Sequence, residues 1–349
     1  MKYVLSSLHA DNVPGLLDGV DTREAWEAER SRIMSEWKRL LGNPPVEGLH
    51  DKRGSGGGFE RLAETQEENH RRLKIAYDSL DGDRITAYLL LPNRSGVETG
   101  KRPAVLALHP TSPNGKDDVS LASGRENRTY GLELVSRGYV VLAPDSITAG
   151  ERIYPGAEAY QTAPFYAQYP EWTAVGKMLA DHIRAVDILA SLPEADGSRI
   201  GAIGHSLGGY NGWFLAGVDP RVRAVVSSCG FSMFAGDPDP NRWGQRDWFS
   251  HFPVVTGMLG EGRIPFEWHE IAALAAPVPL FMWSGIGDRI FPNWSAIAAG
   301  MADLAGLYRF LGQDERFEFW MGPAGHDFPA KVRQMAYEFL DRHLLTKPS

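Results

Sequence analysis

The stretch Arg199-Ile-Gly-Ala-Ile-Gly-His-Ser-Leu-Gly-Gly-Tyr210 contains a G-x-S-x-G sequence centred on Ser206. A short apolar run precedes it at 200–203, and a helix-compatible run follows it at 210–216. This order of strand, sharp turn and helix predicts a strained turn that holds the Ser206 hydroxyl clear of a sheet. The flanking glycines fit, because a Cβ would clash where the helix and the strand approach each other. The alternative is a glycine-rich turn without chemistry.

The composition is that of an ordinary globular protein. The chain has 349 residues, of which 43% are hydrophobic and 23% charged, enough for one large domain or one domain with an appendage. The net charge of −8 and the lack of a Lys/Arg-rich block argue against a nucleic-acid surface. We therefore expect neither a nucleic-acid partner nor, without a run of about 20 apolar residues, a membrane span.

The cysteine content favours a reducing compartment. Cys229 is the single cysteine, so no internal disulfide can form. The apolar run at the N-terminus is too short for a signal peptide. We therefore expect a cytoplasmic protein.

The first 70 residues predict a helical extension. Asp21 or Thr22 can cap a helix that ends at Gly42-Asn-Pro-Pro45. Its apolar residues recur at helical spacing and give one apolar face: Trp26, Ile33, Trp37, Leu40 and Leu41. We prefer a helix packed on the main domain over a dimer-forming arm, although the helix is also the place where we would expect a homodimer contact. Residues 48–60 read as a flexible, glycine-rich loop.

Residues 71–349 predict one α/β domain with a mostly parallel, doubly wound sheet. Strands are expected at 73–78, 85–92, 104–109, 139–143, 200–203, 222–228, 278–284 and 317–321. Helices are expected at 128–137, 172–192, 210–216, 294–311 and 330–345. In such sheets the reactive groups gather at the carboxyl ends of the strands. The segment 231–270 interrupts the alternation, is rich in aromatic residues and reads as a small cap insertion.

Two residues after later strands complete a nucleophile–base–acid set with Ser206. Asp288 follows the strand 278–284, and His326 follows the strand 317–321. A serine becomes a nucleophile when a histidine takes its proton and a carboxylate orients that histidine. We therefore predict a catalytic triad of Ser206, His326 and Asp288.

Other carboxylates are weaker candidates for the acid. Asp314 and Glu315 precede a strand, which puts them at the opposite end of the sheet. Asp327 neighbours the histidine in sequence and is expected to cap the last helix.

The oxyanion donors are expected from two backbone N–H groups. Leu207 begins the helix after the nucleophile, and the second donor should come from the loop His109-Pro110-Thr111-Ser112. Pro110 has no N–H, so Thr111 is the predicted donor. His109 either lines the substrate pocket or braces the loop.

Several of these motifs resemble a known family. Gly204-His-Ser-Leu-Gly-Gly209, with Asp288 and His326, resembles the α/β-hydrolases. The segments 102–110, 138–145 and 150–152 look like the dienelactone hydrolase and acetyl-xylan-esterase-like branch, and the likeness covers most of residues 71–345. This resemblance implies the α/β-hydrolase fold.

The chain departs from that branch at the nucleophile. Dienelactone hydrolases proper use a cysteine, whereas position 206 is serine, which favours ordinary ester hydrolysis. Cys229 is misplaced for a nucleophile and is read as a buried small residue near the site.

The substrate-binding residues are less well defined by the sequence. Aromatic walls suit sugar rings or aryl esters, although half of these residues could equally be core. Glu151 and Arg152 either brace a loop with Asp145 or face the substrate. The candidates are His109, Glu151, Arg152, Trp172, Trp243 and Trp248.

The leading function is a serine esterase that works through an acyl-enzyme on a small-molecule ester, such as an acetyl or other short-acyl ester of a sugar or aromatic alcohol. The alternatives are a serine peptidase or amidase of the same fold and a non-catalytic binding protein. The sequence shows no metal-binding cluster, phosphate loop or dinucleotide fingerprint, so we predict no cofactor.

Overall fold

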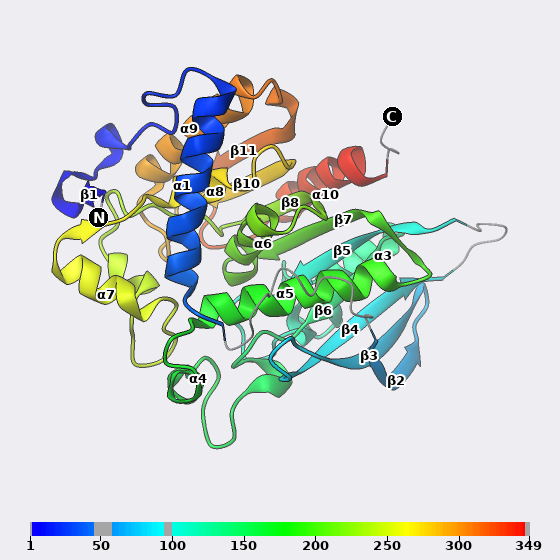
Figure 1. Ribbon diagram of the computed structural model, residues 1–349. Coiled ribbons are helices and arrows are strands. Elements are labelled where there is room, and N and C mark those ends of the chain that lie inside the picture. Colours follow the sequence, from blue (N-terminus) through cyan, green and yellow to red (C-terminus); the bar gives the residue numbers. More distant parts are fainter. Residues whose placement is uncertain (1, 45–57, 94–99, 346–349) are drawn as a thin grey trace.

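A nine-stranded sheet forms the centre of the computed structural model, which describes residues 2–44, 58–93 and 100–345 (Figure 1). The strand order is β11-β10-β8-β7-β5-β6-β4-β3-β2. The strands are β2 (Glu60–Gln66), β3 (His70–Asp78), β4 (Arg84–Pro92), β5 (Arg102–Leu108), β6 (Val140–Pro144), β7 (Ala195–His205), β8 (Val222–Ser228), β10 (Leu280–Gly285) and β11 (Phe317–Gly322). All neighbours from β6 to β11 pair in parallel, and β2, β3 and β4 extend the sheet antiparallel.

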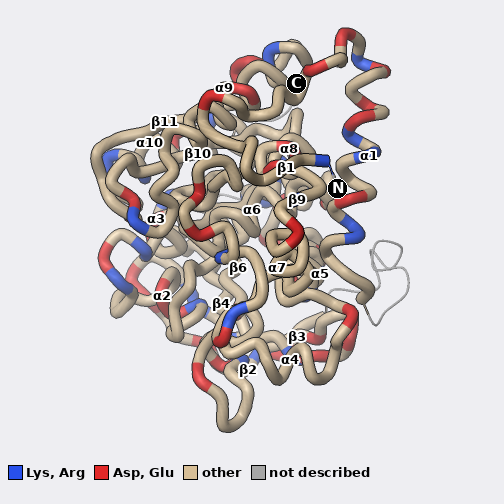
Figure 2. The backbone as a smooth tube through the Cα atoms, turned by 90° about the vertical axis from the view of Figure 1, so that its left-hand side faces the viewer, with Lys and Arg blue, Asp and Glu red and all other residues tan. Residues whose placement is uncertain are grey.

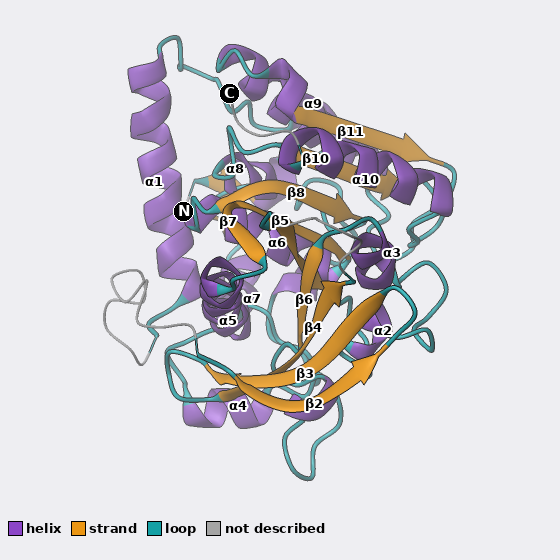
Figure 3. Cartoon of the chain, turned by 90° about the vertical axis from the view of Figure 1, so that its right-hand side faces the viewer, coloured by secondary structure: helices purple, strands orange, loops and turns teal. Residues whose placement is uncertain are grey.

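Helices cover both faces of this sheet (Figure 3). α3 (Tyr130–Ser136) and α10 (Ala330–Leu344) pack on one face, whereas α5 (Ala174–Ser191) and α6 (Leu207–Val218) pack on the other. The buried apolar side chains accordingly form two clusters, one on each face. This arrangement confirms the predicted mostly parallel, doubly wound α/β sheet. No helix among the described residues is long and apolar enough to cross a membrane.

The edge strand β2 was not predicted. It lies within the first 70 residues, so that segment contributes a strand to the sheet as well as a helix. All of its side chains are exposed, and the sequence Glu-Arg-Leu-Ala-Glu-Thr-Gln therefore lacks the apolar alternation that identifies a half-buried strand. The loop predicted at 48–60 lies outside the described residues except for its last three positions.

The N-terminal helix α1 (Arg23–Leu41) packs on the domain (Figure 1). Of the two predicted caps, the structure uses Thr22, whose Oγ1 accepts a hydrogen bond from the Ala25 N–H at 3.1 Å. The helix contacts α8 (Trp268–Ala273) through one face, and its buried side chains are Trp26, Ile33, Trp37 and Leu40. This contact fits the preferred reading of a packing helix.

We expect Trp37→Ala to lower the free energy of unfolding by about 3–5 kcal/mol, because it leaves a large cavity in the core. The Trp37 side chain is fully buried, and its ring lies 4.6 Å from Phe214 and 5.7 Å from Phe252 between centroids. Urea unfolding monitored by circular dichroism measures the change. The exposed neighbour serves as a control, since Lys38→Ala should stay within about 0.5 kcal/mol of wild type. An unchanged midpoint for Trp37→Ala would mean that α1 is not part of the core.

The segment 231–270 forms short elements, and α8, which begins in it, packs against α6. It contains α7 (Pro253–Gly260), the start of α8, and β9 (Arg263–Ile264), which pairs with β1 (Tyr3–Val4) as a small separate sheet (Figure 2). Many of its aromatic rings are core, as the 4.3 Å separation of the Trp243 and Trp268 ring centroids shows. The other α-helices of the described residues are α2 (Asp117–Ser120), α4 (Ala163–Gln168) and α9 (Trp294–Phe310).

Candidate active site

Ser206 lies on a sharp turn between β7 and α6. Its backbone has φ 54° and ψ −117°, a conformation that costs a non-glycine residue free energy and persists where the surrounding structure enforces it. A Cβ on Gly204 would lie 2.2 Å from the carbonyl carbon of Gly208, and one on Gly208 would lie 2.0 Å from the Leu108 oxygen. Both glycines are therefore required for the helix to approach the sheet.

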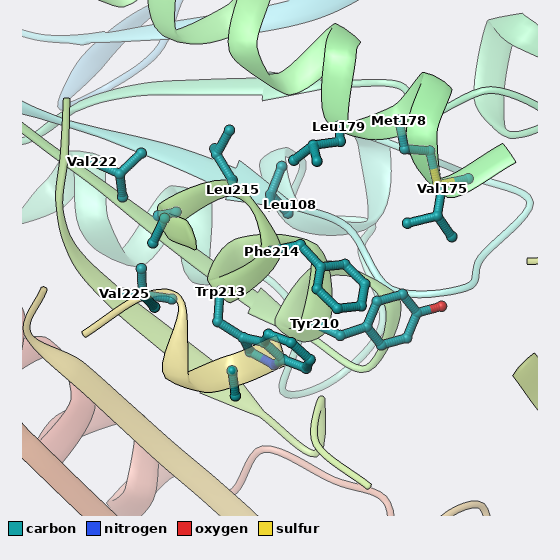
Figure 4. Packing of buried hydrophobic residues seen from close by; sticks show 14 of the residues in the cluster. Leu108, Val175, Met178, Leu179, Tyr210, Trp213, Phe214, Leu215, Val222 and Val225 are labelled. Atoms are coloured by element: carbon teal, nitrogen blue, oxygen red, sulfur yellow. The ribbon is translucent and has the colours of Figure 1, made fainter. Parts of the chain in front are cut away.

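The helix that follows Ser206 is firmly anchored. Tyr210, Phe214 and Leu215 of α6 pack among buried residues such as Leu108 of β5 and Val175 of α5 (Figure 4). The N–H of Ser206 also donates to the Ser228 carbonyl at 2.8 Å, which ties the turn to the end of β8. The strain at Ser206 is therefore held by contacts on both sides.

Asp288 and His326 meet at the carboxyl ends of β10 and β11. The Nδ1–H of His326 donates to Oδ2 of Asp288 at 2.7 Å. The other carboxylate oxygen accepts the N–H groups of Ile290 and Phe291 at 2.7 and 3.1 Å, which fixes the carboxylate. Because an ionised carboxylate only accepts, this contact places the ring proton on Nδ1 and leaves Nε2 with a lone pair.

Ser206 and His326 line the same pocket, which has a volume of about 320 Å³. Its walls are largely aromatic, and the rings that contribute are His205, Tyr210, Trp243, Trp248, Phe249, His251, Phe291 and His326. Of the predicted substrate-binding residues, Trp243 and Trp248 lie here. Trp243 is buried, whereas Trp248 is 42% exposed at the rim.

The two predicted oxyanion donors lie near Ser206. Thr111 lines the pocket beside Pro110. Leu207 is the first residue of α6, and the first N–H groups of a helix have no partner within it. Tyr160 holds the loop, because its hydroxyl accepts the Ser112 N–H at 2.9 Å and donates to a neighbouring carbonyl. The oxyanion role of Thr111 and Leu207 stays a prediction.

His109 braces this loop and does not line the pocket, so its assignment to substrate binding is corrected. It is buried, Nε2 accepts the Ser146 N–H at 3.0 Å, and Nδ1 lies 2.8 Å from the Pro110 oxygen. Both ring nitrogens are thereby occupied within the protein. Of the two roles that the sequence left open for His109, the structure shows the one in which the ring braces the loop.

Glu151, Arg152 and Trp172 also lie outside the lining of the pocket, and their assignment to substrate binding is likewise corrected. Glu151 pairs with Lys74 and with Lys116, and Arg152 pairs with Asp83 and, at 2.8 Å, with Asp181. A buried guanidinium needs carboxylate partners, and these ion pairs use its donors.

Trp172 is buried in a separate aromatic group. Its ring centroid lies 5.9 Å from that of Phe165 and 5.8 Å from that of Tyr169. The ring is therefore part of the core near the start of α5.

Cys229 lies directly behind the Asp288–His326 pair. It is buried, its thiol donates to the Asp327 carbonyl at 3.4 Å, and burial raises the pKa of the thiol to about 12. The Cys229 sulfur, a carboxylate oxygen of Asp288 and a ring nitrogen of His326 all lie within 4.8 Å of one another, so these three atoms could together hold a metal ion. Two of these residues, Asp288 and His326, are already joined to each other by a hydrogen bond.

The rival carboxylates are engaged elsewhere. Asp327 pairs with Arg128 at 2.8 Å and accepts a hydrogen bond from Asn127 at 3.0 Å. Asp314 pairs with Arg309 at the surface. The carboxylate that faces the His326 ring in the described chain is Asp288.

Four arginines in the pocket lining were missed by sequence reasoning: Arg125, Arg128, Arg242 and Arg246. They come from two segments far apart in the chain and belong to no recognisable motif. Tyr210 and His251, whose hydroxyl and Nε2 lie 2.6 Å apart, were also missed. The proximity of Arg242 and Arg246 to the tryptophans of the aromatic-rich segment was the available signal.

Comparison with known proteins identifies the fold family. The sequence of residues 121–243 matches the dienelactone hydrolase family. A glucuronoyl esterase from Solibacter usitatus superposes with a TM-score of 0.71 at 18% identity, over 96% of this chain and 98% of that one. The chain therefore has the α/β-hydrolase fold, and its residues 121–243 are similar to the dienelactone hydrolase family.

The chain also has curated relatives in sequence. The putative hydrolase YtaP of Bacillus subtilis strain 168 is 26% identical over 90% of this chain and all of its own length. The acetyl esterase Axe7A of Xylanibacter ruminicola is 32% identical over 34% of this chain, which corresponds to 28% of that esterase. Carboxylic ester hydrolases are thus relatives of this chain in both sequence and structure.

Proposed function

We propose that the protein is a serine hydrolase that cleaves carboxylic esters through an acyl-enzyme formed on Ser206. The observation that carries the proposal is the strained turn at Ser206, which opens into the same pocket as the His326 ring held by Asp288. The His326 ring, with its proton on Nδ1, is ready to accept the serine proton at Nε2.

The reaction has two halves. Ser206 Oγ attacks the ester carbonyl while Nε2 of His326 takes its proton, and the N–H groups of Thr111 and Leu207 stabilise the oxyanion. His326 then protonates the leaving alcohol as the C–O bond breaks. Water attacks the acyl-enzyme with His326 again as base, which releases the acid and restores Ser206. Asp288 stabilises the imidazolium in both halves.

The substrate class we infer is an acetyl or other short-acyl ester of a sugar or an aromatic alcohol. The names of an acetyl esterase and a glucuronoyl esterase among the similar proteins support a sugar ester. The largely aromatic walls of the pocket also suit a flat ring. We further propose a cytoplasmic location, which the single cysteine supports.

A fluorophosphonate probe tests the nucleophile directly. We expect the probe to label Ser206, identified by peptide mass spectrometry, and to block hydrolysis of 4-nitrophenyl acetate in parallel. Ser295 is an exposed serine on α9, so Ser295→Ala should be labelled as wild type is, whereas Ser206→Ala should not be labelled. Absence of labelling in folded wild type would favour the non-catalytic alternative. Faster cleavage of an amide than of its matched ester would favour the peptidase.

A further inference from the structure

A second cavity lies at the edge of the sheet opposite to Ser206. It is a groove of about 1020 Å³ that shares no lining residue with the pocket around Ser206. Pro279 and Arg316, which directly precede β10 and β11, line this groove, whereas Asp288 and His326 follow the same two strands. In Figure 3 the arrowheads of β8 and β11 point away from α1, which contributes lining residues to the groove. The groove is therefore separate from the proposed catalytic residues.

The Lys, Arg, Asp and Glu side chains that line this groove are all basic. No aspartate or glutamate is among its lining residues in the described part of the chain, although the protein has a net charge of −8. The lining cations come from α1, β7, β8, the position before β11 and the end of α10, and they are Arg30, Lys38, Arg199, Arg223, Arg316 and Arg342. We call this cavity the basic groove.

Two of these cations are neutralised by carboxylates outside the lining. Arg199 pairs with Asp196 at 2.8 Å, and Arg342 pairs with Glu318. Arg199 also donates to two backbone carbonyl groups, at 3.2 and 3.0 Å. These contacts hold the two guanidinium groups within the protein, which lowers their capacity for an external ligand.

Arg30, Lys38 and Arg223 have no ion-pair partner. No carboxylate oxygen lies within 4.0 Å of their charged groups among the residues that the structure describes. Arg30 donates to the Leu274 carbonyl at 3.0 Å, a contact that leaves its positive charge unneutralised. Lys38 and Arg223 are exposed, so both can reach a molecule bound in the groove.

The pKa of His343, which also lines the basic groove, reflects the same excess of positive charge. Burial lowers this pKa, and the positive charges of Arg342 and Arg316 lower it further. Glu315 acts in the opposite direction, but its contribution is the smallest of the four. Arg316 itself reaches Glu315 only at 4.0 Å. The nearby carboxylate therefore does not cancel the cations at this end of the groove.

The uncharged part of the lining is mainly aliphatic. It includes Met34, Val218, Leu274, Pro277 and Val278, and no phenylalanine, tyrosine or tryptophan is among the lining residues in the described ranges. Nucleic-acid bases and sugar rings bind by stacking on such aromatic rings. Aliphatic side chains of a peptide can instead cover this apolar surface. The groove therefore suits a molecule that carries both carboxylates and aliphatic groups.

We propose that the basic groove binds an acidic segment of a partner protein. The carboxylates of this segment pair with Arg30, Lys38 and Arg223, and its aliphatic side chains cover the apolar lining. Clusters of basic side chains recognise acidic motifs in this way, and opposite charges also speed up the encounter of two proteins. The groove lies away from Ser206, so this binding does not depend on the esterase function.

Fluorescence anisotropy with two labelled peptides tests the proposal. One short peptide alternates glutamate with leucine, and the other has glutamine in place of every glutamate. We expect the full chain to bind the glutamate peptide about tenfold more tightly than the glutamine peptide, because the contributions of several exposed ion pairs add up. Added salt should weaken the binding of the glutamate peptide alone.

Two double variants of equal net charge locate the site. Lys38→Glu combined with Arg223→Glu turns two attractions into repulsions and should weaken binding of the glutamate peptide about tenfold. Arg309→Glu combined with Lys331→Glu makes the same change in net charge at exposed positions outside the groove lining. The affinity of this control should stay within about twofold of wild type, because salt screens distant charges. Both double variants should hydrolyse 4-nitrophenyl acetate as wild type does.

Circular dichroism establishes that the variants are folded, and Lys38→Glu alone serves as the readout if the double variant is not. Equal binding of the two peptides, no binding of either, or an equal loss in both double variants overturns the proposal. Oligogalacturonate is a polyanion without aliphatic side chains. If it displaces the labelled peptide as well as unlabelled glutamate peptide does at the same concentration of carboxylate groups, the groove is a general polyanion site and the proposed protein segment is wrong. A lack of ester hydrolysis by wild type, by contrast, would contradict only the esterase proposal.

Discussion

We expect Ser206→Ala to lower kcat/KM for 4-nitrophenyl acetate by about a thousandfold or more, with little change in fold. The substitution removes the oxygen that forms the acyl-enzyme, and the residual rate comes from binding and oxyanion stabilisation alone. Alanine also lacks the longer side chain, so it can adopt the backbone of Ser206 at φ 54° with at most a similar strain. Initial rates over a range of substrate concentrations measure the loss.

Ser295→Ala serves as the matched control, because it deletes the same atom from an exposed position on α9. Its kcat/KM should equal that of wild type. Retention of near wild-type turnover by folded Ser206→Ala would contradict an acyl-enzyme on Ser206. The far-ultraviolet circular dichroism spectrum and the unfolding midpoint establish that the variant is folded.

The central strands and the positions that follow them were predictable from the sequence. A strand buried on both faces reads as an unbroken apolar run, as at 104–108, which lie in β5 and are all buried. Ser206, Asp288 and His326 each follow a predicted strand, and parallel strands bring the residues after them to one edge of the sheet. Their proximity was therefore predictable without any knowledge of loop structure.

The side-chain partners of the loops were not predictable. Arg152 and Arg246 are both arginines near aromatic residues in sequence, and no local pattern separates them. The structure pairs Arg152 with Asp83 and Asp181, which are distant in the chain, whereas Arg246 receives no carboxylate among the described residues. Whether an arginine is paired with a carboxylate or left unpaired in the pocket lining therefore depends on residues distant in the chain. The strand β2 was not predicted because all of its side chains are exposed, so its sequence shows no alternation of apolar and polar residues.

The second large effect is expected at Asp288. We expect Asp288→Asn to lower kcat/KM for 4-nitrophenyl acetate by about three to four orders of magnitude. An amide oxygen can still accept the N–H groups of Ile290 and Phe291, so the turn should be retained. The amide NH₂ would then face Nδ1 of His326, and it favours the tautomer in which Nε2 carries the proton and cannot accept one from Ser206.

Asp314→Asn is the matched control for the Asp288 variant. Asp314 is an exposed carboxylate whose partner is Arg309, and its side chain lies outside the lining of the pocket, so activity should be unchanged. Asp327 is a less suitable control, because it anchors Arg128 in the pocket wall. If the Asp288→Asn variant kept more than about a tenth of wild-type activity, another group would have to orient His326. Because the contact of Asp288 with His326 supports the proton transfers of the chemical steps, the loss should appear in kcat as well as in kcat/KM. A carboxylate that served only in substrate binding would change KM instead.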